Sequence, residues 1–219
     1  PPDDPSEIVE GGIRAQRELL SGFKGNPEVN PQRWREAQHP NQAAISLAGE
    51  PTLYPLLGSL IEELHRRGFT TFLVSNGTLP ERLEGLEVEP TQLYLTLPAP
   101  DRETYERVCR PRIPDGWERL NRSLELLSSF SCRRVLRLTL VKGLNLKDPE
   151  GYAKLVEKAE PDFLEPKGYF PVGYSRQRLG PPFMPSHREI RDFAERLQGL
   201  TGYRIVDEVP VSSVVLMKK

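Results

Sequence analysis

The stretch SLIEELHRRGFTTFLVSNG, residues 59–77, holds one complete helix–strand unit. Apolar residues recur at helical spacing in its first half, and Gly68 ends that pattern. Residues 70–75 are rich in β-branched and apolar side chains, which is typical of a strand, and Asn76-Gly77 predicts a turn directly after it. A helix that leads straight into a strand is the repeating unit of α/β folds.

The same alternation extends along the chain in both directions. Strands are predicted at residues 42–47, 70–75, 92–97, 134–141 and 162–165. Helical patterns of about 10–15 residues separate them. Several of these helices begin at a capping residue, namely Asp4, Asp101, Asp115, Asp148 and Ser186. In the first helix, the expected apolar face consists of Ile8, Gly12, Ala15 and Leu19.

Repeated strand–helix units predict an α/β fold with a parallel sheet, which is either an open doubly wound sheet or an incomplete barrel. Two further strands, at 203–206 and 213–217, are predicted to close the chain as a hairpin. No shift in composition marks an internal boundary, so residues 1–219 are expected to form a single domain.

Composition and charge narrow the classes of protein to which the chain can belong. Lys plus Arg number 30 and Asp plus Glu number 31, a net charge of −1, so bulk charge does not favour coating by nucleic acid. No apolar run is long enough for a membrane span. Cys109 and Cys132 have neither CxxC nor zinc-site spacing, and we expect them to be reduced and structural in a cytoplasmic protein.

Polar residues and glycines follow each of the five parallel strands. The strand ends are Gly49-Glu50-Pro51, Ser75-Asn76-Gly77, Thr96-Leu97-Pro98, Val141-Lys142-Gly143 with Asn145, and Glu165-Pro166-Lys167-Gly168. Since ligands of α/β proteins bind at the carboxyl ends of the strands, these residues predict a pocket for a small polar cofactor. No GxGxxG or Walker A loop is present, and any one of these strand ends taken alone is also an ordinary turn.

Five strings resemble, in order, one branch of the radical S-adenosylmethionine (SAM) enzymes. They are AISLAGEPTLYP (44–55), TFLVSNG (71–77), TQLY (91–94), RLTLVK (137–142) and FLEPKG (163–168). The branch is the tRNA 4-demethylwyosine synthase family in its stand-alone archaeal form. The resemblance runs from about Asp4 to the C-terminus.

The resemblance implies an incomplete (β/α) barrel of the radical SAM type that closes with a C-terminal β-hairpin. It also implies a [4Fe-4S] cluster on a CxxxCxxC loop, which cleaves SAM and needs an electron donor. The reaction implied is the formation of 4-demethylwyosine, a lyase-type carbon–carbon bond formation on N1-methylguanosine of phenylalanine tRNA with carbon from pyruvate. We expect a cytoplasmic, monomeric enzyme.

Carried over residue by residue, the resemblance assigns a group of SAM-binding residues and places Lys167 at the last barrel strand. The SAM group is Gly49, Glu50, Pro51, Ser75, Asn76, Thr96, Lys142 and Asn145. Local charge and aromatic content, and not the resemblance, extend Lys167 into a second group for tRNA or substrate, which is Lys167, Tyr169, Tyr174, Arg176 and Arg178. Residues 163–191 support the second group, because they carry five cations against two anions, with aromatic residues that suit stacking on unpaired bases. The alternative is that these aromatic residues pack the loop onto the barrel.

The chain departs from the family pattern in two ways. It contains no CxxxCxxC motif, so no metal ligand is assigned here, and we expect the first strand and the cluster loop upstream of Pro1. Pro98 stands where the family pattern has an acidic residue. Two other functions therefore stay open, a cluster-less barrel that only binds RNA or a partner, and a metal-free enzyme on a phosphate-bearing substrate. The second is disfavoured because no glycine-rich phosphate loop opens the late helices.

Overall fold

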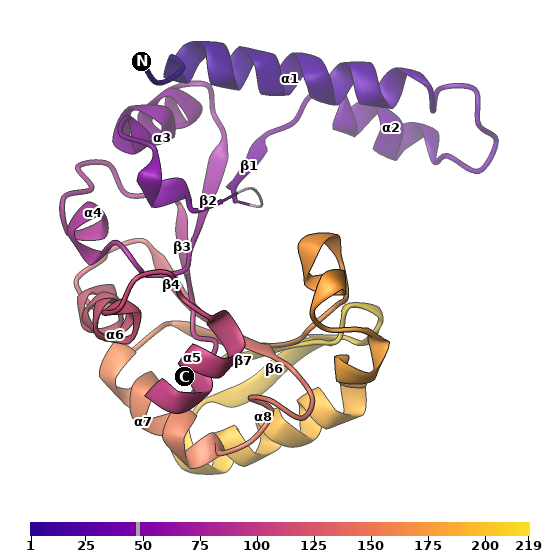
Figure 1. Ribbon diagram of the computed structural model, residues 1–219. Coiled ribbons are helices and arrows are strands. Elements are labelled where there is room, and N and C mark those ends of the chain that lie inside the picture. Colours follow the sequence, from indigo (N-terminus) through magenta and orange to yellow (C-terminus); the bar gives the residue numbers. More distant parts are fainter. Residues whose placement is uncertain (47–48) are drawn as a thin grey trace.

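One sheet forms the centre of the molecule. The computed structural model describes residues 1–46 and 49–219, and within them seven strands form this sheet in the order β1-β2-β3-β4-β5-β7-β6 (Figure 1). The strands are β1 (Gln42–Ile45), β2 (Thr70–Ser75), β3 (Gln92–Thr96), β4 (Arg133–Leu140), β5 (Phe163–Gly168), β6 (Arg204–Val209) and β7 (Val214–Lys218). The first five are parallel, and β7 pairs antiparallel with β5 and β6.

Helices cover one side of this sheet. The α-helices are α1 (Pro5–Ser21), α2 (Pro31–Ala37), α3 (Leu57–Arg66), α4 (Pro80–Glu84), α5 (Arg102–Cys109), α6 (Gly116–Leu127), α7 (Pro149–Ala159) and α8 (His187–Thr201). Four 3₁₀ turns, found within the described ranges, are η1 (Pro51–Leu53), η2 (Gly173–Gln177), η3 (Pro181–Phe183) and η4 (Pro210–Ser212). Figure 1 shows α3, α4, α6, α7 and α8 along the outer side of a curved sheet that does not close. The predicted incomplete barrel is therefore confirmed.

The hydrophobic core lies between the strands and these outer helices. Every second residue of the central strands is buried in it, such as Leu73, Leu95 and Leu138, against helix residues such as Ile61 and Leu124. The alternate residues face the inner side of the curved sheet, because successive side chains of a strand point to opposite faces. The outer face thus stabilises the fold, and the inner face is left for polar side chains.

Most elements predicted from the sequence are confirmed. The parallel strands and the closing hairpin are found, although β1 ends at Ile45 and residue 47 of the predicted strand lies outside the described residues. The capping box at Ser186 is confirmed, with Glu189 as its partner. The short helices α2 and α4 were not predicted, because five to seven residues give too little periodicity. Whether residues 1–219 are a single domain stays a prediction. No described helix is long and apolar enough to cross a membrane.

The predicted apolar face of α1 is wrong. Val9 is the buried residue of this helix, whereas Ile8 is 37% and Leu19 73% exposed. Val9 packs with Leu60 and Leu64 of α3, so the contact with α3 and not the apolar spacing decides which face is covered. Gly12 and Ala15 are exposed as well.

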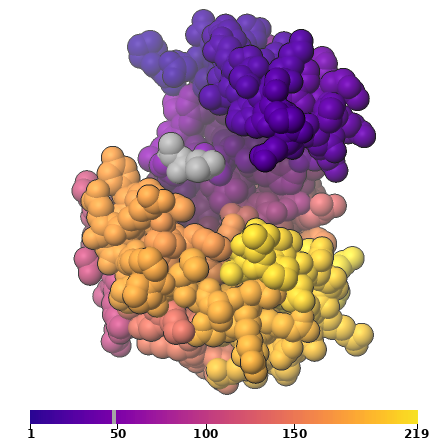
Figure 2. Space-filling view, turned by 90° about the vertical axis from the view of Figure 1, so that its right-hand side faces the viewer, coloured from indigo at the N-terminus to yellow at the C-terminus, as the bar shows by residue number. Residues whose placement is uncertain are grey.

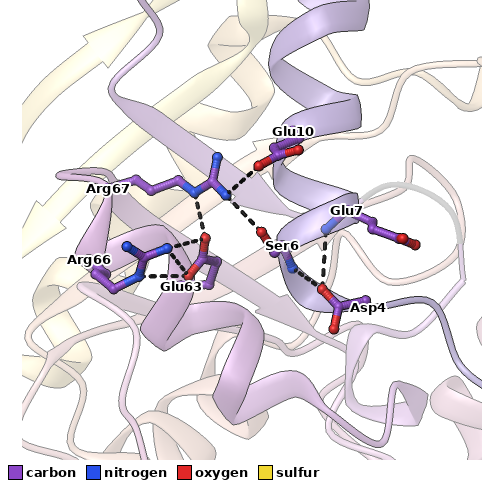
Figure 3. A network of polar contacts seen from close by, with 7 residues as sticks. All are labelled: Asp4, Ser6, Glu7, Glu10, Glu63, Arg66 and Arg67. Atoms are coloured by element: carbon purple, nitrogen blue, oxygen red, sulfur yellow. Dashed lines mark hydrogen bonds and ion pairs between the residues drawn. The ribbon is translucent and has the colours of Figure 1, made fainter.

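A polar network holds the start of α1 against the end of α3 (Figure 3). Arg67 donates to Glu63 within its own helix, at 2.5 Å, and to Ser6 and Glu10 of α1, at 2.8 and 3.1 Å. Asp4 caps α1 by accepting from the Ser6 N–H at 2.8 Å. Hydrogen bonds from Arg66 and Arg67 lower the pKa of the Glu63 carboxyl below its usual value. This network fixes the start of α1 against the end of α3.

Candidate functional site

The carboxyl ends of the five parallel strands lie along one edge of the curved sheet. Figure 2 looks onto the open inner side and shows the surface hollowed between the indigo N-terminal elements and the orange and yellow C-terminal elements. Two glycines expose backbone at this edge, Gly49 after β1 and Gly143 after β4. Both have positive φ, 79° and 73°, and a Cβ atom at either would meet no atom of residues 1–46 and 49–219 within 4 Å. Among these residues, nothing fills the space beside the two glycines.

Glu50 ties the end of β1 to the end of β2. Its Oε1 accepts from the Thr52 N–H at 3.2 Å, and from the hydroxyls of Thr52 and Ser75, both at 2.8 Å. Its Oε2 accepts from the Asn76 N–H at 2.8 Å. The carboxylate, predicted as part of the SAM site, thus bonds to protein donors. It shapes the site by fixing the two turns.

The turn after β2 is fixed by its own side chains. Ser75 is 1% exposed, and its hydroxyl also accepts from the Gly77 N–H at 3.1 Å. Asn76 is exposed, and its Oδ1 accepts from the N–H and the hydroxyl of Thr78 at 2.9 and 2.6 Å. Gly77 has a φ of 71°, and a Cβ there would lie 2.8 Å from Leu95. The edge of the sheet at the carboxyl ends of the parallel strands is called the mouth of the open barrel below. Asn76 is therefore the side chain that this turn presents at the mouth.

Asn145 belongs to the scaffold, which corrects its predicted role as a SAM ligand. It is fully buried, and its Nδ2 donates to the carbonyls of Pro98 and Thr139 at 2.5 and 2.8 Å. Its Oδ1 accepts from the Val141 N–H at 2.5 Å. An asparagine after a strand suits either role, and only its burial separates them. Pro98 stands where the family pattern has an acidic residue, and its carbonyl accepts one of these hydrogen bonds from Asn145.

Lys142 and Thr96 lie at the ends of β4 and β3. The Lys142 ammonium pairs with Glu189 of α8 at 2.7 Å and stays half-exposed. This bond, together with the Ser186 N–H at the start of the helix, lowers the pKa of the Glu189 carboxyl to about 2. Thr96 is partly buried and stands opposite Arg137 of β4 in the sheet register. Lys142 therefore joins the mouth to α8, and Thr96 faces the inner side.

The inner wall carries a charged cluster that the sequence alone did not indicate. Arg137 donates to Glu165 at 2.6 Å and lies over the Tyr94 ring, 4.5 Å from its centroid. Both partners of the ion pair are largely buried, with side chains 23% and 12% exposed. Burial, reinforced by the nearby Glu165 charge, raises the pKa of Tyr94. The signal that could have found the cluster is the strand alternation, which places these side chains on the face away from the helices.

Lys167 lies on the same inner face of the sheet, two residues after Glu165 on β5, and is therefore nearer the mouth. It stands between Thr139 of β4 and Val214 of β7 in the register. Among residues 1–46 and 49–219 no ion-pair partner of Lys167 is found within 4.0 Å. An unpaired, partly buried ammonium on the inner wall suits an anionic group of a ligand.

The predicted stacking role of Tyr169 is wrong, because its ring is only 8% exposed. Its hydroxyl donates to the Leu179 carbonyl at 2.7 Å, which packs residues 170–179 against the barrel. Tyr174, by contrast, is 87% exposed. Arg176 and Arg178 are exposed, and they donate to the carbonyls of Pro171 and Val108 at 2.7 and 2.9 Å. Packing onto the barrel therefore describes Tyr169, whereas a stacking role for the exposed Tyr174 stays a prediction.

Metal ligands are not found in the part of the chain that the structure describes. No group of three His, Cys, Asp or Glu residues there is placed to hold a metal ion. Burial raises the pKa of both Cys109 and Cys132 to about 11, so both are protonated thiols at neutral pH. The described residues therefore do not fit an iron–sulfur cluster.

Comparison with known proteins identifies the family. Residues 24–156 match the radical SAM superfamily, and residues 158–219 match the family described as wyosine base formation. The S-adenosyl-L-methionine-dependent tRNA 4-demethylwyosine synthase of Pyrococcus horikoshii is 57% identical over 223 residues, which cover 100% of this chain and 65% of the relative. The synthase of Methanocaldococcus jannaschii is 37% identical over 99% of this chain and 68% of its own length.

Solved structures agree with these matches. A structure of TYW1 with a lysine–pyruvate adduct bound superimposes with a TM-score of 0.89 at 36% identity, over 99% of this chain and 70% of that one. The crystal structure of archaeal TYW1 gives a TM-score of 0.83 at 34% identity, with the same coverage. The chain thus spans about two thirds of the length of these relatives. It belongs to the radical SAM superfamily and, within it, to the tRNA 4-demethylwyosine synthase family.

Proposed function

We propose that the protein forms 4-demethylwyosine in tRNA by SAM-dependent chemistry. The observation that carries the proposal is the mouth of the open barrel, where exposed backbone at Gly49 adjoins the exposed Asn76. The adjacent matches to the radical SAM superfamily and to wyosine base formation support it.

The residues at the mouth suit SAM. We assign the main chain of residues 49–51 to its amino group, since a glycine with open space beside it lets a ligand approach the backbone. Asn76 and Thr96 provide donors for the ribose and the carboxylate, and Lys167 is assigned to an anionic group of the tRNA or of its co-substrate. When bound, SAM supplies the adenosyl group for the radical chemistry of the superfamily. Two protonated thiols do not provide three thiolate ligands, so we place the ligands of the [4Fe-4S] cluster outside residues 1–219.

The tRNA and the remaining partners are proposed on chemical grounds. Tyr174 projects into solvent and is close in sequence to the exposed Arg176 and Arg178. A side chain that stacks on an unpaired base has to be exposed in this way. We propose N1-methylguanosine of phenylalanine tRNA as the substrate. Pyruvate as carbon source is supported by the relative solved with a lysine–pyruvate adduct. An external electron donor, a monomeric state and a cytoplasmic location complete the proposal.

The test is product formation under anaerobic conditions. Full-length protein that includes the proposed cluster ligands, with its cluster loaded, is incubated with reductant, SAM, isotope-labelled pyruvate and tRNA that carries N1-methylguanosine, and the nucleosides are analysed by mass spectrometry. We expect 4-demethylwyosine that contains label, and none when SAM is omitted. A protein that binds the tRNA but neither cleaves SAM nor forms product would support the alternative, a barrel that acts only as an RNA-binding module.

A further inference from the structure

Arg82 of α4 bonds to the turn that follows Gly49-Glu50-Pro51. Its Nε donates to the Thr52 carbonyl at 3.1 Å, and its Nη2 donates to the carbonyls of Tyr54 and Pro55 at 3.0 and 3.2 Å. One planar guanidinium thus satisfies three carbonyls of a single turn. Such a fork of donors is particular to arginine, because a lysine ammonium is a single point charge on a flexible stem.

The same turn is held at its other end by Glu50. Glu50 accepts from the N–H and the hydroxyl of Thr52, while Arg82 bonds to the Thr52 carbonyl. A carboxylate therefore binds the donors of the turn and a guanidinium binds its acceptors. The backbone of residues 49–51 leads directly into this doubly held segment, so a shift at Gly49 would break bonds on both sides.

Arg82 is not required to keep α4 in place. Pro80 and Leu83 anchor that helix, and Leu83 is only 2% exposed in the core. Arg82 itself is exposed apart from its bonds to the turn. It lies about thirty positions from the turn along the chain and in none of the strings that carry the family resemblance. Its contacts therefore fix the turn and not the helix.

We propose that Arg82 is a positioning residue for SAM. It does not touch the ligand, but it holds the backbone of residues 49–51 in the conformation that receives the amino-acid end of SAM. Preorganisation of this kind improves binding because the turn no longer has to be ordered when the ligand arrives. The inference rests on the proposed function, since it assigns a role at the same site.

The experiment compares Arg82→Met and Arg82→Lys with the parent protein. In full-length protein that includes the proposed cluster ligands, with its cluster loaded, Arg82→Met should weaken SAM binding by about tenfold, the effect of losing bonds to a charged group, with Arg82→Lys intermediate. The KM for SAM should rise while the KM for tRNA and kcat at saturating SAM stay near the parent values. In the cluster-free protein, amide hydrogen exchange of residues 49–56 should become faster.

Arg119→Met is the matched control. Arg119 of α6 pairs with Asp115 and with Glu81 of α4, next to Arg82 in sequence, but it makes no bond to the turn. It should bind SAM as the parent does. Faster exchange in Arg82→Met with unchanged SAM affinity would overturn the proposal, as would unchanged exchange. If the parent itself bound no SAM, the proposed function would fall, and with it the assignment of Arg82 to SAM. The exchange data would still show whether Arg82 holds the turn.

Discussion

Replacement of Glu50 by glutamine tests whether one carboxylate joins two strand ends. Glutamine can keep the three donors at the Oε1 position, but its amide nitrogen then faces the Asn76 N–H, donor against donor. The bond lost is one to a charged group, which contributes about 1.5–3 kcal/mol. Because the site is only partly buried, we expect the free energy of unfolding to fall by about 2 kcal/mol.

The assay is urea unfolding followed by circular dichroism. Glu36→Gln is the control, because Glu36 bonds only to Gln32 and Arg33 on the exposed helix α2, where a change of less than about 0.5 kcal/mol is expected. Ser75→Ala combined with Glu50→Ala should cost less than the sum of the single changes, since each removes the bond between Ser75 and Glu50. If Glu50→Gln is no more destabilising than Glu36→Gln, the carboxylate is not the tie that its geometry indicates.

Three further predictions concern the turn after β2, the exposed segment and α8. Gly77→Ala should destabilise the protein by about 2–4 kcal/mol in the same assay, because φ is positive and the new Cβ would lie 2.8 Å from Leu95; an effect below about 1 kcal/mol would contradict this. Tyr174→Ala should weaken tRNA binding about tenfold in filter binding, the loss expected for one stacked base, and unchanged affinity would exclude stacking there. The folded pKa of Glu189, about 2, lies below its usual 4.5, so the stability that it contributes is present above about pH 4.5 and is lost as the pH falls towards 2. Lys142→Met should flatten the pH dependence of unfolding in that window, and an unaltered profile would show that the Lys142 ion pair is not its source.

The sequence was sufficient for the positions of the strands along the chain but not for the buried faces of the elements. Alternating periodicity and capping residues predict the parallel strands and most helices, because these signals are local. The buried face of α1 is decided by its contact with α3, which lies some fifty residues later, so Val9 and not Ile8 is covered. The helix α4 escaped prediction for a related reason, since Pro80 and Leu83 are helical mainly because they pack into the core.

The strand ends that the sequence predicts as lining the site lie along one edge of the sheet, but the sequence does not distinguish their exposed side chains from their buried ones. Asn76 and Asn145 both follow strands, yet Asn76 is exposed at the mouth and Asn145 is fully buried in a tie between β3 and β4. Tyr169 and Tyr174 differ in the same way, one packed and one projecting. The residue type is the same in each pair. Burial, which depends on the path of the chain around each residue, separates the side chains that can meet a ligand from those that hold the scaffold.

That division follows from how the mouth is built. Turns after parallel strands carry backbone groups that the sheet does not satisfy, so nearby polar side chains are needed to bond them. Glu50, Asn145 and Arg82 do this, each by several bonds to the turns of neighbouring elements. Their charged and polar groups are thus already bonded to the turns at this edge of the sheet. What remains for the proposed ligand is the backbone at Gly49 and the side chains of Asn76 and Lys167, so the polar residues that bond most extensively at this edge are the ones least available to it.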